Sequence, residues 1–217
     1  MTDARRTQIE RVGESSRRLF QAAAELITEG SFDTATAAEI GRRAGYSRSM
    51  VHARFGSREK LFEAILTEAY ESRLLAALPL ATSGLDRVLA RIGSTAELLE
   101  SSPELVRTIF TIEFQAAGNE SAMSERVAHW VHSLGHDIHA SIIEGLADAS
   151  IRPGIDADSA AHGIVSEGIG AAFIWIVNPS EDMGLRITQW RDRTKELLAN
   201  PPHPHPSPAR PQKRHPA

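Results

Sequence analysis

Four histidines recur at helical spacing in the second half of the chain, at His129, His132, His136 and His139. Intervals of three, four and three residues place their side chains in one row along a helix. Such imidazoles can chelate a metal ion, exchange protons with a substrate, or line a cavity as hydrogen-bonding groups. No carboxylate stands between the histidines in this row, although Asp137 follows His136 directly. We therefore favour a partly buried polar row that lines a cavity or is hydrogen-bonded to neighbouring helices, and we expect neither a metal site nor a cofactor.

A second chemical signal is a basic segment from Arg42 to Lys60, in a chain whose formal net charge is -4 at pH 7. The segment holds six Arg and Lys residues and a single acidic residue, Glu59. Contacts to nucleic-acid phosphates need local rather than overall positive charge. The segment is therefore typical of a DNA-binding face on an acidic body.

The elements that would position these groups begin with a helix predicted over residues 15–29. Its apolar residues recur three and four positions apart, and Gly30 supplies a stop. We expect residues 1–14 to form a flexible N-terminal arm. A capping box follows the first helix, in which Thr36 caps a short helix to about residue 44 and Glu39 reaches back to the Thr36 backbone.

A tight turn joins this short helix to the next one. Gly45 can take the left-handed conformation that ends a helix, and Ser47 can cap the following helix, predicted over residues 48–54. Val51 and Phe55 are its inward contacts. The residues left mostly outward are Arg48, Ser49, Met50, His52 and Arg54.

Two short helices around a glycine-containing turn form a helix-turn-helix, which places its second helix in the DNA major groove. Each base pair presents a distinct pattern of donors and acceptors there, so side chains early in that helix can read the sequence. Arg48 is the first candidate for a base contact.

The stretch from about Arg17 to Leu61 resembles the tetracycline-repressor-like (TetR) family of regulators, and the rest of the chain matches that family only in being helical. The residues that carry the resemblance, in order and spacing, are Leu19, Phe20, Ala22, Ala23, Gly30, Phe32, Thr34, Ala35, Thr36, Ile40, Ala44, Gly45, Ser47, Phe55, Gly56, Ser57, Arg58, Glu59 and Leu61. The resemblance implies an all-α fold, with an N-terminal three-helix DNA-binding domain and a C-terminal helical bundle for dimerisation and ligand binding.

The resemblance also implies roles for individual residues. Thr36 and Arg58 would anchor phosphates, and the outward residues of the second helix would lie in or beside the groove. This chain has His52 where the family usually has tyrosine, Arg58 where it has lysine, and Ser49 where it often has glycine. Arg58 keeps the positive charge beside a helix N-terminus, whereas His52 would add a pH dependence that tyrosine lacks. The expected DNA-binding residues are Thr36, Ser47, Arg48, Ser49, Met50, His52, Arg54 and Arg58.

The remainder of the chain is predicted to be helical to about residue 199. The helix over residues 156–177 is apolar nearly all round and rich in Gly and Ala, so other helices can approach it closely. By resemblance, the last two helices would pair with their copies in a homodimer that reads an inverted repeat in double-stranded DNA. The expected segments are an arm (1–14), a helix-turn-helix domain (15–60), a ligand-binding and dimerisation domain (61–199) and a disordered Pro-rich tail (200–217).

A small-molecule effector is a further implication of the resemblance. Its binding would release the protein from its operator, so the expected role is that of a repressor, and no residue identifies the effector. The candidate effector contacts are three histidines and four aromatic residues, although aromatic residues at helical spacing more often form plain core. They are Phe110, Phe114, Trp130, His132, His136, His139 and Trp175.

Composition narrows the possible classes. The chain has no cysteine, which excludes disulfides and thiolate metal sites and fits a reducing compartment. Its N-terminus lacks the apolar segment of a signal peptide, and the longest strongly apolar stretch, Ile169 to Val177, is too short to span a membrane. We expect a cytoplasmic protein with no membrane partner.

Two alternatives compete with the regulator interpretation. A helical enzyme would use the histidine row as an acid–base centre, but the chain has no nucleophile motif, phosphate-binding Gly loop or compact carboxylate pair, so we expect no enzyme. A DNA-binding protein without an effector would need no cavity. An enclosed pocket among the helices spanning residues 84–177 would argue against that second alternative.

Overall fold

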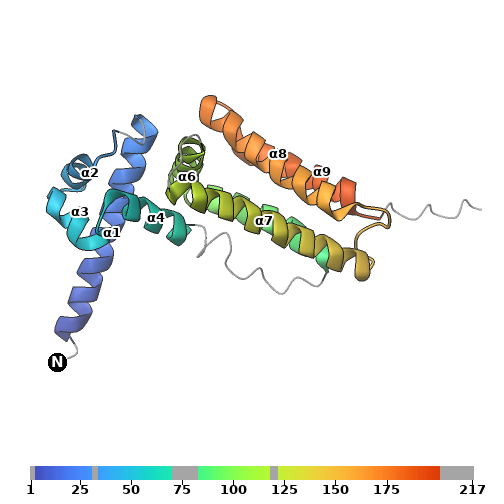
Figure 1. Cartoon of the computed structure of the whole chain (residues 1–217), viewed down its shortest axis with the longest axis horizontal. Coiled ribbons are helices and arrows are strands. Elements are labelled where there is room, and N and C mark those ends of the chain that lie inside the picture. Colours follow the sequence, from blue (N-terminus) through green and yellow to red (C-terminus); the bar gives the residue numbers. More distant parts are fainter. Residues whose placement is uncertain (1–2, 31–33, 70–82, 118–121, 201–217) are drawn as a thin grey trace, which may run out of the picture.

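The computed structural model describes residues 3–30, 34–69, 83–117 and 122–200 (Figure 1). Over these ranges the helices, in chain order, are α1 (Asp3–Glu29), α2 (Ala37–Arg43), α3 (Arg48–Phe55), α4 (Arg58–Ala69), α5 (Gly84–Ser101), α6 (Pro103–Ala116), α7 (Ala122–Ala147), α8 (Ala157–Val177) and α9 (Met183–Leu198). The same ranges contain one isolated β-bridge, between Ile151 and Ala199, and no strand. The all-α prediction is confirmed.

The four N-terminal helices share a small core. Leu19 and Ile27 of α1, Ile40 of α2, Val51 of α3 and Leu61 of α4 are all at most 1% exposed. The three shorter helices are arranged against the long α1 (Figure 1). Because each helix contributes a fully buried aliphatic side chain, α3 has a fixed position relative to its neighbours.

The first helix begins at Asp3, so its predicted start near Ser15 is wrong. The prediction relied on apolar periodicity, which is weak before that residue. Residues 3–14 nevertheless include strong helix formers such as Ala4, Arg5 and Glu10. Extending an existing helix needs no new nucleation, so these residues continue α1 in place of the expected irregular arm.

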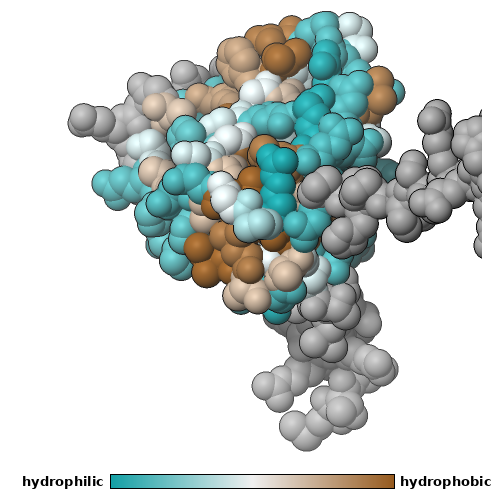
Figure 2. All heavy atoms as spheres, turned by 90° about the vertical axis from the view of Figure 1, so that its right-hand side faces the viewer, coloured by the Kyte–Doolittle hydropathy of each residue, from teal (hydrophilic) through white to brown (hydrophobic). Residues whose placement is uncertain are grey.

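The C-terminal part is a bundle with α5 at its centre, packed against α6, α7 and α9. Val88 and Ile92 of α5, Ile138 and Ile142 of α7, and Ile187 of α9 are at most 2% exposed. Helix α8 completes the bundle by packing on α6, α7 and α9. The end of the molecule that lies to the right in Figure 1 mixes hydrophobic and hydrophilic residues at its surface (Figure 2).

Close approach at two glycines sets the spacing of the bundle. Gly84, at the start of α5, lies so near the backbone of Gly145 in α7 that a Cβ there would clash. Gly168 of α8 receives the ring of Trp190 from α9, whose Cη2 would stand 2.7 Å from an added Cβ. For Gly168 this is the close helix approach that the small residues of this segment predict.

Helix α8 is long and apolar enough to cross a membrane by length and composition alone. A core helix of a soluble protein meets the same two criteria. It packs against α6, α7 and α9, and 33% of its most apolar window is buried inside the structure.

The two parts of the chain meet through α6, which packs on both α1 and α4, and through α7. Arg126 of α7 donates to Glu63 Oε1 (2.6 Å) and to Thr67 Oγ1 (2.5 Å), both on α4.

The predicted domain boundary at residues 60 and 61 falls inside α4, which therefore belongs to both parts. The predicted Pro-rich tail, residues 200–217, lies outside the described residues except for Asn200.

Candidate nucleic-acid interface and effector groove

The turn between α2 and α3 has the predicted geometry. Gly45 has a φ of 77°, in the left-handed region that favours glycine. Gly41 of α2 lies against the turn, because a Cβ there would stand 2.8 Å from Ser47 O. On α3, Val51 is fully buried and the ring of Phe55 packs 5.4 Å from that of Phe20. The inner face of α3 is thus anchored and its outer face is left to solvent.

An ion pair between distant residues fixes α2 against α1. Both terminal nitrogens of Arg43 donate to the Glu29 carboxylate, at 2.7 and 2.8 Å, and Glu25 lies 3.6 Å from the same guanidinium. The hydrogen bond from Arg43 lowers the pKa of Glu29 below its ordinary value. Sequence reasoning treated Arg43 as part of a basic DNA-facing surface, and no local signal reveals a partner fourteen residues away.

The helix caps agree only in part with the predicted capping pattern. Thr36 Oγ1 accepts a hydrogen bond from the Glu39 amide (3.2 Å), as expected. The other predicted contact of the capping box, from the Thr36 amide to the Glu39 carboxylate, is wrong. The Glu39 carboxylate binds Arg42 instead, and the Thr36 amide donates to Thr34 O. Ser47 precedes α3 but makes no capping hydrogen bond, and its hydroxyl pairs with that of Ser49 at 2.7 Å.

Arg54 has a structural contact that the sequence did not suggest. Its Nη2 donates to Ser15 Oγ at 2.6 Å, and Ser15 is only 4% exposed. This hydrogen bond joins the last turn of α3 to α1. Arg54 therefore holds α3 in place, whereas the sequence predicts it as a DNA contact.

The remaining DNA-binding candidates differ in their exposure to solvent. Thr36, Ser47, Arg48, Ser49 and His52 are exposed, whereas Met50 and Arg58 are half-buried. Arg58 bonds to Glu59 (Nε to Oε1, 3.2 Å) and lies over the Phe62 ring. Ser57 Oγ accepts from the Lys60 amide and so caps α4.

Ion pairing changes the charge balance of this surface. Arg42 pairs with Glu39, Arg43 with Glu29, and Arg58 with Glu59. In the described part of the chain, exposed Arg48 and Lys60 form no ion pair. The cations free to meet phosphates are therefore fewer than the six counted in the sequence.

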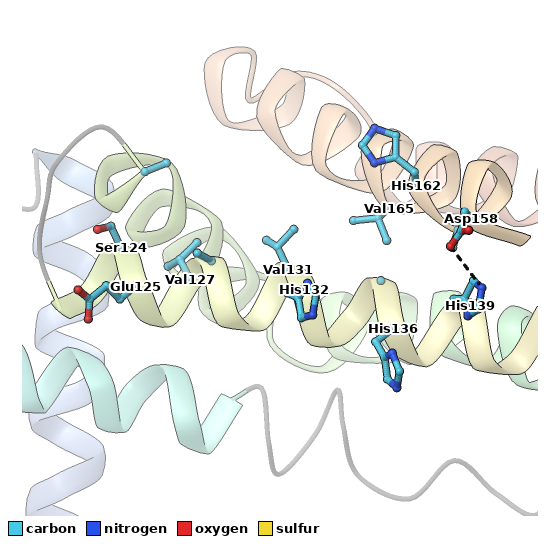
Figure 3. Close-up of a pocket in the computed structure, with 14 residues that line it drawn as sticks. Ser124, Glu125, Val127, Val131, His132, His136, His139, Asp158, His162 and Val165 are labelled. Atoms are coloured by element: carbon cyan, nitrogen blue, oxygen red, sulfur yellow. Dashed lines mark ion pairs between the residues drawn. The ribbon is translucent and has the colours of Figure 1, made fainter.

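A groove of about 1040 Å³ opens between α7 and α8 (Figure 3). This groove is open to solvent. It is therefore not the enclosed pocket whose presence would have argued against the alternative of a DNA-binding protein without an effector. Small aliphatic side chains from both helices line it, together with the polar residues Ser124, Glu125, His132, His136, His139, Asp158 and His162. His139 Nε2 lies 3.3 Å from Asp158 Oδ1 across the groove (Figure 3).

Three of the seven predicted effector contacts, His132, His136 and His139, line this groove, and the four aromatic residues do not. Of the three, His139 reaches across to α8, whereas His136 points away from it (Figure 3). Trp130 and Trp175 are buried, the latter beside Arg107, and Phe114 packs edge-on against Phe173. Aromatic side chains have the largest apolar areas to bury. Packing them against other side chains is therefore more favourable than leaving them at the wall of an open groove. His162 and Asp158, which α8 brings to the groove, were not predicted, because no local spacing signal marks them.

The histidine row itself is divided between solvent and groove. His129 is exposed and does not line the groove. His132, His136 and His139 line it, but His132 and His136 are exposed as well, and only His139 is half-buried. The prediction of a partly buried row is therefore wrong for three of the four histidines. No group of three or more potential ligands is arranged to hold a metal ion among the residues that the structure describes.

A set of large apolar side chains is exposed where α8 ends and α9 begins. Phe173, Ile174 and Val177 of α8 and Leu185 of α9 are between 46% and 65% exposed. On α8 they share a side with Ser159, Gly163, Ser166 and Gly170, at helical spacing. Such a cluster is typical of a protein–protein contact surface.

Two short helices around a left-handed glycine turn, with the outer face of the second helix exposed and a helical bundle beside them, define a helix-turn-helix DNA-binding fold. Residues 19–65 match the family described as bacterial regulatory proteins, tetR family. No curated protein sequence matches the chain.

Solved structures extend this likeness to the whole fold. A TetR-family regulator from Rhodococcus sp. superposes with a TM-score of 0.69 at 17% identity, over 85% of this chain and 98% of that one. SmeT, the repressor of a Stenotrophomonas maltophilia multidrug efflux pump, gives 0.68 at 19% identity over 88% and 97%. The regulator TylP from Streptomyces fradiae gives 0.65 at 22% identity over 88% and 89%. These comparisons show a TetR-like fold over most of the chain, with a match to the tetR family model in the helix-turn-helix region.

Proposed function

We propose that this protein is a cytoplasmic transcriptional repressor that binds an inverted-repeat operator as a homodimer and leaves it when a small molecule binds. The observation that carries the proposal is the arrangement of α3. Its inner face is held by Val51, Phe55 and Arg54, while Arg48 and Ser49 are exposed in its first turn. A rigid helix with exposed polar residues in its first turn is suited to reading base edges.

Two residues divide recognition between base and phosphate. Arg48 is exposed, forms no ion pair within the described residues and can donate two hydrogen bonds to a guanine edge. Arg58 stands in the first turn of α4, where a helix N-terminus favours an anion, and a phosphate would replace Glu59 as the partner of its guanidinium. Thr36, Ser47, Ser49, Met50 and His52 are the further proposed contacts of this face.

The experiment compares Arg48→Ala with Arg58→Ala on a selected operator and on an unrelated duplex. Arg48→Ala should weaken operator binding by about 1–3 kcal/mol and leave binding of the unrelated duplex almost unchanged. Arg58→Ala should weaken both alike, because phosphate contacts carry no sequence information. An unchanged specificity ratio for Arg48→Ala would show that α3 is not placed in the groove as proposed.

The apolar cluster at the junction of α8 and α9 supports the homodimer. Two identical surfaces of this kind can cover each other about a two-fold axis, which also places two α3 helices on successive major grooves. Without a partner, Phe173 and Val177 would remain largely in water.

The groove between α7 and α8 supports effector binding, through His132, His136 and His139. Near the N-terminus of α7 the groove is lined by Glu125 and Val127, the two neighbours of Arg126 in the chain. Arg126 itself donates hydrogen bonds to Glu63 and Thr67 of α4. A ligand in the groove therefore acts on the same turn of α7 that holds the DNA-binding helices. Such a ligand releases DNA only as far as it binds the non-DNA conformation more tightly.

A screen of small molecules by thermal shift tests this part, with Ala161→Phe as the variant that fills the groove. Ligands of the groove should stabilise the wild type and not the variant. A ligand that stabilises both equally would bind elsewhere. A folded, operator-binding protein that no compound releases would favour the alternative without an effector.

A further inference from the structure

His52 stands in the last turn of α3, with an exposed side chain, among the residues proposed to face DNA. Its ring nitrogen Nδ1 lies 3.0 Å from the carbonyl oxygen of Gly56, the residue that ends α3. A carbonyl oxygen can only accept a hydrogen bond, so Nδ1 must be the donor. The contact thus assigns the ring proton to Nδ1.

This assignment determines what the other ring nitrogen can do. A neutral imidazole that carries its proton on Nδ1 has a lone pair on Nε2 and accepts there. Phosphate oxygens also only accept. Neutral His52 therefore has no hydrogen bond to offer DNA, whereas the protonated ring donates from Nε2 and brings a positive charge.

We infer that His52 is a phosphate contact of this protein only in its protonated form, so that DNA binding takes up a proton at His52. The inference rests on the proposed function, because it needs the outer face of α3 to meet DNA. The position near the C-terminal end of α3 is one where a helix favours a cation.

The charged groups around His52 come from its own helix and from the helices that pack against it. They are Arg48 and Arg54 on α3, Glu39, Arg42 and Arg43 on α2, Arg58, Glu59, Lys60 and Glu63 on α4, and Glu14, Arg17, Arg18, Glu25 and Glu29 on α1. Four of these arginines are held by Glu39, Glu29, Glu59 and Ser15, as described above. Arg48, four residues before His52, forms no ion pair within the described chain. A second positive charge beside Arg48 is favourable only once a phosphate is present, which links protonation to DNA binding.

The test measures salt dependence at two pH values. The full chain is titrated onto a labelled 24-base-pair duplex of arbitrary sequence by fluorescence anisotropy, at several KCl concentrations, at pH 5.5 and at pH 7.5. Histidine is the side chain that most often changes charge between two such values. A phosphate contact is independent of sequence, so no operator is required.

For the wild type, the slope of log K against log [KCl] should be steeper at pH 5.5 than at pH 7.5. The difference should be roughly 0.9 for each His52 that meets a phosphate. His52→Gln and His52→Tyr donate a neutral hydrogen bond at both pH values, so their slopes should not differ between the two. His129→Gln, which removes an exposed histidine of α7 that does not line the groove, should keep the wild-type difference.

Two results would overturn the inference alone: a wild-type slope that is equal at both pH values, or a His52→Gln slope that changes as much as the wild type. A folded wild type that binds no duplex at either pH would overturn the proposed function and the inference with it. Circular dichroism at both pH values establishes folding for each variant.

Discussion

The guanidinium of Arg126 on α7 and the carboxylate of Glu63 on α4 lie 2.6 Å apart, although 63 residues separate them in the chain. The same guanidinium donates to Thr67 Oγ1, one turn further along α4. These contacts join the bundle to the last helix of the N-terminal part. Arg126 also has groove-lining neighbours on both sides, Glu125 and Val127.

The ion pair between Arg126 and Glu63 should couple the two helices measurably. Both side chains are partly exposed, so a double-mutant cycle with Arg126→Ala and Glu63→Ala should give a coupling energy below about 1 kcal/mol. Hydrogen exchange should become faster along α4 in Arg126→Ala. The control is Arg87→Ala, which removes an ion pair between Arg87 of α5 and Glu144 of α7. It should leave the hydrogen-exchange rates along α4 unchanged. Additive effects in the cycle would mean that the contact carries no coupling.

Glycine at position 84 should be required for the packing of α5 on α7. A Cβ at residue 84 meets the backbone of Gly145 and Ser141, which cannot move aside as a side chain can. We expect Gly84→Ala to cost about 1–3 kcal/mol or more of unfolding free energy. Gly93→Ala is the matched change in the same helix, with open space around the new methyl group, and should stabilise by up to about 1 kcal/mol. Urea denaturation measures both, and equal effects would contradict the packing.

Asp148 should make stability depend on pH in the acid range. A hydrogen bond from the Ser150 side chain, and then those from the Gly84 and Ser150 amides, lower the pKa of Asp148 below its ordinary value. A lowered carboxyl pKa stabilises the fold above the unfolded-state pKa, and this contribution disappears as the pH falls through the folded-state pKa. Asp148→Asn should therefore be less stable than the wild type at pH 7, and the difference should shrink below about pH 4. A difference that stays constant from pH 7 to pH 3 would exclude this linkage.

We expect the exposed apolar cluster to hold the proposed homodimer together. Phe173→Ser removes a large side chain, 52% exposed on α8, and should shift the protein toward monomer in analytical ultracentrifugation. Ile143→Ser changes a similarly exposed residue of α7 and should leave the assembly intact. If both variants behave like the wild type, the dimer uses another surface.

The sequence was sufficient to predict the local structure of the helix-turn-helix. Helix period, the Thr36 cap and Gly45 are local signals, and each appears as expected. The side-chain partners were not predictable, because Arg43 and Glu29 or Arg54 and Ser15 meet only when distant helices pack. The same holds for the groove, where spacing revealed one wall, the histidines of α7, while the opposite wall depends on how α8 lies against α7.

The central claim is that α3 reads DNA as part of a two-fold assembly, and selection from a random duplex pool tests it most directly. The wild type should enrich an inverted repeat whose half-sites lie about 34–36 Å apart, and binding to it should weaken steeply as salt increases. A folded dimer that enriches no sequence would contradict the claim.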